Sequence, residues 1–182
     1  MLRSSSLTIG VLLLFACQHA PEPTTYLAAA AQASQRGPLD VVRLLARWDT
    51  AGKTLSYGDD ADYDSARDFL ICWLPSEQCQ TDEPGWDSHS VVSGYTMRLA
   101  IQDGDSALVE VKYDKVADWS GASHYVVDQQ PIRWTVHLER TDARWRVVDP
   151  ESQKEPFISR DAALRLMART RSDTMAVLSE RP

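Results

Sequence analysis

The sequence has no apolar run long enough to cross a membrane. A membrane-spanning helix needs about 20 apolar residues, whereas the N-terminal apolar run, Leu7 to Ala16, has ten. The chain also lacks a glycine-rich phosphate loop, an H-E-x-x-H pair and a G-x-S-x-G turn. Basic residues are fewer than acidic ones, 19 against 26, which argues against a nucleic-acid partner. We therefore expect none of the common hydrolase, metalloprotease or nucleotide sites, and no cofactor.

The N-terminus has the pattern of an export signal. Arg3 supplies a basic start, and the apolar run that follows has the length of a signal peptide's central region. We therefore expect an exported protein. An ordinary signal peptide would be cut near Ala20 or within Ala28 to Ala31, where small residues are frequent.

The end of this run, Leu14-Phe15-Ala16-Cys17, resembles the lipobox of bacterial lipoproteins. In that family the cysteine is diacylated and becomes the first residue of the mature chain. The resemblance implies that residues 1–16 are a lipoprotein signal peptide and that Cys17 carries the lipid anchor on the periplasmic side. Gln18 follows the cysteine, where an aspartate would imply retention at the inner membrane, so the resemblance favours the outer membrane.

Lipidation of Cys17 would also explain the odd number of cysteines, which is three. It leaves Cys72 and Cys79 as a pair, and an exported protein can form a disulfide between them. A loop of this length would stabilise the fold by about 2.5 kcal/mol through its effect on the unfolded chain. The six intervening residues do not match a zinc-site spacing, and no histidine cluster completes a ligand set. We expect no metal.

Residues 17–37 are rich in proline, threonine and alanine, and we interpret them as the lipid anchor and a tether with a few helical turns. We expect residues 38–182 to form one domain. Apolar periodicity predicts helices over Pro38–Thr54 and Tyr63–Leu74, strands over Val91–Ile101, Ala107–Tyr113, Ile132–Glu139 and Arg144–Pro150, and a last helix that begins at Ser159. This order predicts an α+β fold in which N-terminal helices pack on a curved antiparallel sheet, with a C-terminal helix.

The order of elements and the final strand motif, ARWRVVDP, resemble the cone-shaped fold of the nuclear-transport-factor-two-like superfamily. A cystatin-like arrangement is the alternative. Enzymes of that superfamily place an Asp or His, often with a Tyr, in an apolar pocket between the helices and the sheet. The residues with suitable chemistry are Tyr57, His89, Tyr95, Tyr113 and Asp114. No family motif can be transferred onto them, so we assign no catalytic residue.

The acidic segment from Gly58 to Asp68 has aspartates at alternate positions, as at the start of a calcium-binding EF-hand loop. Counted from Asp60, the required glycine is Ser65 and the required glutamate is Ile71. The segment therefore fails as a calcium loop. We expect Asp62 or Asp64 to cap the following helix.

Two groups of side chains are candidates for contact with a partner. Trp86 and Trp119 lie in polar, turn-rich segments, where a tryptophan either covers the core or is an exposed anchor. The other group is expected on the outer side of the sheet, opposite the apolar Ile132, Trp134, Val136 and Leu138. Its basic members are Arg98, Lys112, Arg133, His137, Arg144 and Arg146. Such a face is either an ordinary solvated surface or a docking surface for an acidic partner.

These patterns favour a non-catalytic envelope lipoprotein that binds another envelope or secreted protein, as an inhibitor or immunity-type protein does. The partner would be a toxin or an enzyme, and a homodimer through the sheet face is a further option. The alternatives are a carrier of a small apolar ligand and an isomerase or dehydratase of the cone-fold type.

Overall fold

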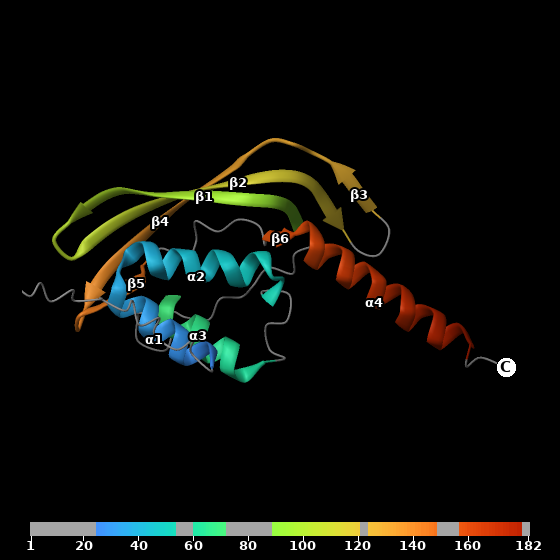
Figure 1. Cartoon of the computed structure of the whole chain (residues 1–182), viewed down its shortest axis with the longest axis horizontal. Helices are drawn as coiled ribbons and strands as arrows, with labels where there is room; N and C mark the ends of the chain where they lie inside the picture. The colour runs from blue at the N-terminus through green and yellow to red at the C-terminus, as the bar shows by residue number, and fades with distance from the viewer. Residues whose placement is uncertain (1–24, 54–59, 72–88, 121–123, 149–156, 180–182) are drawn as a thin grey trace, which may run out of the picture.

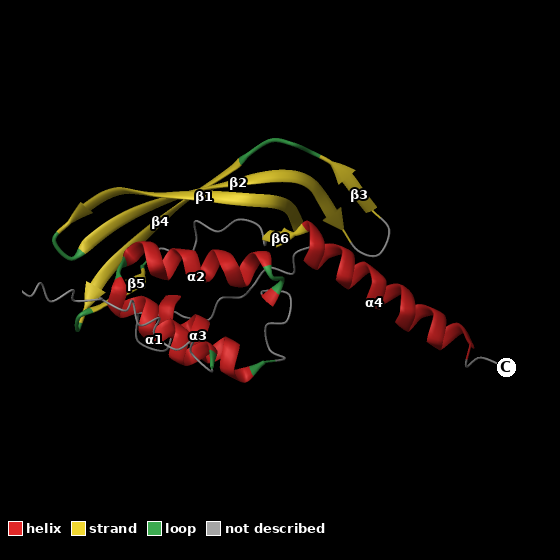
Figure 2. Cartoon of the chain, in the orientation of Figure 1, coloured by secondary structure: helices red, strands yellow, loops and turns green. Residues whose placement is uncertain are grey.

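The computed structural model describes residues 25–53, 60–71, 89–120, 124–148 and 157–179. The side chains at positions 124, 125 and 170–179 are outside this description. The predictions for Cys17, for Cys72 and Cys79 and for Trp86 all lie outside the described residues. A helical layer covers one side of a curled sheet, and a long C-terminal helix extends from one end (Figures 1 and 2).

The helical layer consists of α1 (Tyr26–Arg36), α2 (Pro38–Thr50) and α3 (Ala61–Ile71). Thr25 begins α1, because its Oγ1 accepts a hydrogen bond from the Ala28 amide at 3.1 Å. Pro38 suits the first position of α2, where an amide hydrogen would have no partner within the helix. Asp60 begins α3 by accepting a hydrogen bond from the Tyr63 amide at 3.3 Å. The expected caps, Asp62 and Asp64, lie two and four residues after this position, inside the helix.

Helix α1 belongs to the folded domain, which corrects the assignment of residues up to Gly37 to a tether. Ala30 is 0% exposed and is part of the main core, and Ala33 and Ser34 are also buried. Tyr26 packs edge-on against Trp48, with ring centroids 5.6 Å apart. The alanines let the α1 backbone approach the other helices closely, so a segment of low hydrophobicity can still be buried.

The sheet is mixed, and its strands lie in the order β5-β4-β2-β1-β6, with β3 paired to the far end of β2. The strands are β1 (His89–Asp103), β2 (Ser106–Ser120), β3 (His124–Val127), β4 (Ile132–Thr141), β5 (Arg144–Val147) and β6 (Phe157–Ser159). All pairs are antiparallel except β1 with β6. The expected α+β fold with a curved sheet is confirmed, although the parallel strand β6 was not predicted.

Irregular pairing in the β1–β2 hairpin accompanies its curvature. Register shifts interrupt the pairing near Val92 and again near Ala100, and bulges of this kind increase local twist and bend the strand. Close to the first shift, the Lys115 ammonium contacts Asp118 at 2.8 Å and Asp128 at 2.9 Å. Lys115 thereby ties the bent part of β2 to the residue that follows β3.

The concave side of the sheet holds the main core, as the alternation of apolar residues predicted. Trp134, Val136 and Leu138 of β4 are buried, while the residues between them are exposed. Tyr113 of β2 stacks on Phe157 of β6, with ring centroids 4.0 Å apart. These contacts join the sheet to α2 and α3 in one cluster.

A second, smaller cluster attaches α4 (Arg160–Ser179) to the sheet. It contains Val91 and Ala117, which are paired across β1 and β2, together with Ile158, Ala162 and Ala163. The amide of Ala162 donates a hydrogen bond to Ser159 Oγ at 3.2 Å, so Ser159 caps the helix as predicted. Beyond this contact α4 extends away from the body of the domain (Figure 1).

Candidate functional site

The side of the sheet opposite the main core carries three rows of side chains across β1, β2 and β4. We call this surface the open face. Its rows are Thr96, Lys112 and Arg133; Arg98, Glu110 and Thr135; and Ile101, Leu108 and His137. Residues paired across neighbouring strands point to the same face, and the β4 members alternate with the buried core residues. The predicted outward positions of Arg98, Lys112, Arg133 and His137 are thus confirmed.

The charges on the open face are partly compensated within the chain. Arg98 Nη2 lies 2.6 Å from Glu110 Oε2, and Lys112 Nζ lies 3.5 Å from Asp114 Oδ1. These pairs are solvent-exposed, so each contributes little to stability. Arg133 and His137 form no ion pair with any described residue. They are the members of the face whose charge or hydrogen-bonding capacity is most available to a partner.

The last of the three rows of the open face is largely apolar. Ile101 is 61% exposed, although it is a large aliphatic residue. It faces outward because the register shift near Ala100 reverses the alternation of β1 and pairs Ile101 with Leu108. Leu108 is half-buried and is paired in turn with His137. The open face therefore has an apolar corner, where β1 and β2 approach their hairpin turn, next to polar and charged groups. Protein-binding surfaces commonly combine apolar and polar groups in this way.

Arg144 and Arg146 alternate with the buried Trp145 and Val147, so both leave β5 on its outward side, as predicted, but they do not extend over the open face. Both belong to the edge strand β5, and their guanidinium groups lie over the ring of Phe69 in α3, at 5.5 Å and 5.0 Å from its centroid. Both side chains are half-buried there. Arginine stacks readily on aromatic rings, so these two residues attach β5 to the helical layer.

Trp119 is also not an exposed anchor. It is 8% exposed and belongs to the second cluster, because β2 continues to Ser120 instead of ending in a loop. His89 lies against it, with ring centroids 5.4 Å apart. Burial lowers the pKa of His89, and a hydrogen bond with the Trp119 backbone opposes this effect. His89 therefore belongs to the contact between the start of β1 and the end of β2. Tyr113 pairs with Tyr95, six residues further along β1, and is remote from His89.

A second candidate site lies inside the main core. Tyr113 is 0% exposed, and its hydroxyl has no hydrogen-bond partner among the described residues. Tyr95 is next to it, with ring centroids 5.8 Å apart. Burial raises the pKa of Tyr113, and the nearby carboxylate of the buried Asp49 raises it further. The hydroxyl therefore stays protonated and can only act as a neutral donor or acceptor.

The structure brings together only part of the catalytic set suggested by the fold resemblance. Tyr95 and Tyr113 are neighbours, and Asp49 of α2, which the sequence did not single out, lies near them. Asp114 points to the opposite side of β2, where it pairs with Lys112. Tyr57 lies outside the described residues.

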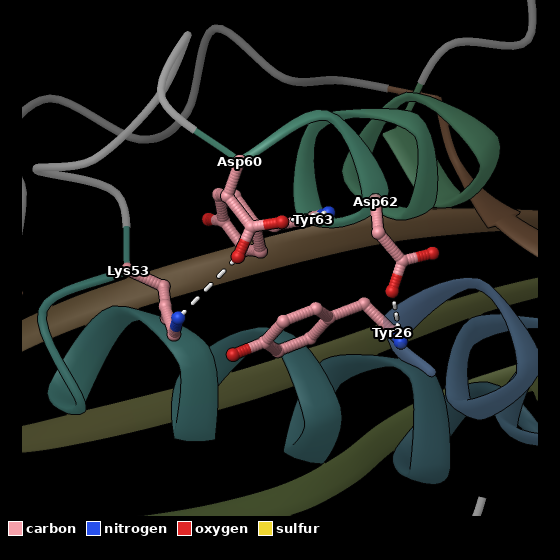
Figure 3. Close-up of polar contacts among 5 residues, drawn as sticks. All are labelled: Tyr26, Lys53, Asp60, Asp62 and Tyr63. Carbon is pink, nitrogen blue, oxygen red and sulfur yellow. Dashed lines mark hydrogen bonds and ion pairs between the residues drawn. The ribbon is translucent and has the colours of Figure 1, made fainter. Parts of the chain in front are cut away.

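The acidic residues at the start of α3 hold the helices together. Figure 3 shows Asp60 directed at Lys53, with the carboxylate oxygen 3.6 Å from Nζ, and Asp62 directed at the amide of Tyr26, 2.8 Å away. Lys53 also lies over the Tyr26 ring, 4.9 Å from its centroid. These contacts fasten the start of α1 to α2 and α3, and they use two of the acidic groups that a cation would need.

Among the residues that the structure describes, no group of three or more His, Cys, Asp or Glu side chains is placed to hold a metal ion. None of the described helices is both long and apolar enough to span a bilayer.

The fold defines a small α+β protein with a strongly curled mixed sheet, one open sheet face and a projecting C-terminal helix. Comparisons with family models, with curated proteins and with solved structures found no match to this chain. The functional argument therefore rests on the two candidate sites.

Proposed function

We propose that this protein is an exported lipoprotein that acts by binding another envelope or secreted protein through the open face, as an inhibitor or immunity-type protein does. The observation that supports this proposal most directly is the apolar row of Ile101 and Leu108 on an otherwise polar sheet face. A solvated sheet face normally carries polar side chains. A large exposed aliphatic residue on the same face as Arg133 and His137, which form no ion pair with any described residue, is better suited to a protein partner.

The chemistry of the face defines the complementary surface. A partner would place an apolar side chain against Ile101 and a carboxylate opposite Arg133, because a guanidinium group can bind a carboxylate through two parallel hydrogen bonds. Arg98 and Lys112 already have acidic neighbours, so they would contribute mainly to the polar rim. Contacts of this type distribute binding energy unevenly, with most of it at the centre of the interface.

The test combines capture of a partner with variants of the face. The tagged mature protein would be used to capture proteins from its own envelope, and binding would then be measured with each purified candidate. We expect Arg133→Glu and Ile101→Ser each to weaken binding by about tenfold or more. Arg165→Glu, an exposed charge reversal on α4, is the matched control and should bind normally. Equal binding by all three variants would remove the open face from the proposal.

The lipid anchor has its own test. Replacing Cys17 with Ser should abolish labelling by radioactive fatty acid and move the protein from the membrane fraction to the soluble fraction. A protein that stays in the membrane fraction without its cysteine would contradict lipidation at this position. Lipidation of Cys17 and binding through the open face are separate claims, so this result does not decide the role of the open face.

A second candidate function is supported by the buried hydroxyl of Tyr113. A polar group that is buried without a partner costs free energy, and such a group can be retained to bind a ligand in the core. The corresponding function is a carrier for a small apolar ligand with one polar group, or an isomerase or dehydratase that uses Tyr113 and Asp49. Loss of ligand binding in Tyr113→Phe, with the fold intact, would favour this function over the open face.

A further inference from the structure

The free edge of β1 is a second interaction surface, separate from the open face. Strand β6 pairs only with Ser90, Val91 and Val92. From Ser93 to Asp103, no described strand pairs with β1 on the side away from β2. This part of β1 lies at the margin of the sheet in Figure 1, with β2 beside it. Within the described part of the chain, this row of backbone amide and carbonyl groups has no strand partner.

This edge has few of the features that prevent strands from pairing. Protected edges usually carry proline, lysine or inward-pointing charges. The sequence from Ser93 to Ile101, SGYTMRLAI, contains none of these. Its one charged residue, Arg98, points to the open face and is paired with Glu110. Among the described residues, only the bulges near Ser93 and Ala100 interrupt this edge, and they leave the regular stretch from Gly94 to Leu99 between them.

The side chains from Gly94 to Leu99 can pair favourably with the same stretch of a second chain. In an antiparallel pair centred on Met97, Tyr95 of one chain lies opposite Leu99 of the other, and Thr96 lies opposite Arg98. Met97 and Tyr95 pack against the main core from the inner side, and Leu99 is partly exposed beside them. Pairing would therefore extend an apolar row across the twofold axis, and it would place no like charges directly opposite each other.

We propose that two copies of this chain associate by antiparallel pairing of their β1 edges, with Met97 on the twofold axis. Strand β6 occupies the edge next to Ser90–Val92, which limits the pairing to residues after Val92. An interface of this length is smaller than that of a stable dimer. We therefore expect a weak dimer, with a dissociation constant of about 10 to 100 µM. The open face remains uncovered in both copies, so this association does not depend on the proposed function.

The test is sedimentation of the mature protein, with Cys17 replaced by Ser, over a concentration range of about 5 to 500 µM. Position 96 reports on the register. Thr96→Glu would face Arg98 of the other chain and should tighten the dimer about three- to tenfold, while Thr96→Lys should weaken it by a similar factor. Thr135→Lys, which lies on β4 away from the edge, is the control and should leave the dissociation constant unchanged.

Two results would overturn the proposal. One is a protein that remains monomeric up to about 500 µM, as it would if another segment of the chain covered the edge. The other is a dimer with the same dissociation constant in the Glu and Lys variants, because the edge pairing brings position 96 next to Arg98. Thermal unfolding of each variant as a monomer shows whether a change comes from folding, since Thr96 is also paired with Lys112.

Discussion

The ring of Tyr113 stacks on the ring of Phe157 with centroids 4.0 Å apart and an angle of 14° between the planes. The two residues come from the long strand β2 and the short strand β6, which are not neighbours in the sheet. The contact joins the two strands across β1 within the main core. It also fixes the direction of the Tyr113 ring, and hence the position of its hydroxyl.

Removal of the Tyr113 hydroxyl should leave the protein as stable as before or stabilise it by up to about 1 kcal/mol. The hydroxyl is buried and has no partner among the described residues, so Tyr113→Phe removes an uncompensated polar group. Phe157→Leu, which removes the stacked ring, should instead destabilise by about 1 to 2 kcal/mol. Urea unfolding of both variants checks this. A loss above about 1 kcal/mol in Tyr113→Phe would mean that the hydroxyl has a stabilising partner.

A charge at Ala30 should destabilise the domain, because α1 packs in its core. Ala30 is fully buried, so Ala30→Asp would place a carboxylate without a counter-charge among apolar side chains, at a cost of about 3 kcal/mol or more. Ala28→Asp is the matched control, because Ala28 is exposed in the first turn of the same helix, where a negative charge suits the helix dipole. Thermal unfolding measures the stability of both variants. Equal stability would mean that α1 is not part of the core and that this segment is a tether.

Glycine at position 143 should stabilise the turn between β4 and β5. Asp142 and Ala143 have φ angles of 52° and 61°, which a two-residue hairpin turn requires but which an alanine adopts only at a cost. We expect Ala143→Gly to raise the free energy of unfolding by about 0.5 to 1 kcal/mol. Ala51→Gly is the control, because Ala51 has a φ of −76° and glycine there should only increase the entropy of the unfolded chain.

Acidification should weaken the fold through His89. Burial holds the pKa of this side chain below 6.5 in the folded protein, whereas the unfolded chain has the ordinary value of about 6.5. As the pH falls below about 6.5, the unfolded state binds a proton first, so stability decreases until the folded-state pKa is reached. His89→Gln should show a smaller decrease in unfolding midpoint over this range. Identical pH profiles for the two proteins would contradict a buried, neutral His89.

The sequence predicted the elements that have a strong period and missed those that depend on tertiary packing. Trp134, Val136 and Leu138 alternate with polar residues, and this alternation placed β4 and its buried side correctly. Strand β6 has only three residues, which is too short for any period. In α1, alanines in the core resemble alanines in a tether, because what buries Ala30 is the close approach of other helices.

In the candidate sites too, the sequence predicted the features that follow from strand periodicity and missed those that depend on tertiary packing. The outward positions of Arg133 and His137 followed from alternation alone. The turn of Arg144 and Arg146 toward Phe69 depends on where α3 lies, and strand periodicity carries no information on that. Trp119 looked like a loop residue because Asp, Ser and Gly surround it, but the strand continues through these residues. Asp49 was missed because its environment is made by Tyr113, which is distant in the sequence.

The start of α1 at Tyr26 also limits how far the domain could move from a membrane. Eight residues separate Cys17 from Tyr26, and a fully extended chain of this length spans at most about 30 Å. With a lipid on Cys17, the segment that links the bilayer to the helical layer would be no longer than the thickness of the bilayer's hydrocarbon core, about 30 Å. A protein held this closely would meet partners within the membrane or on its surface much more often than partners free in the surrounding fluid.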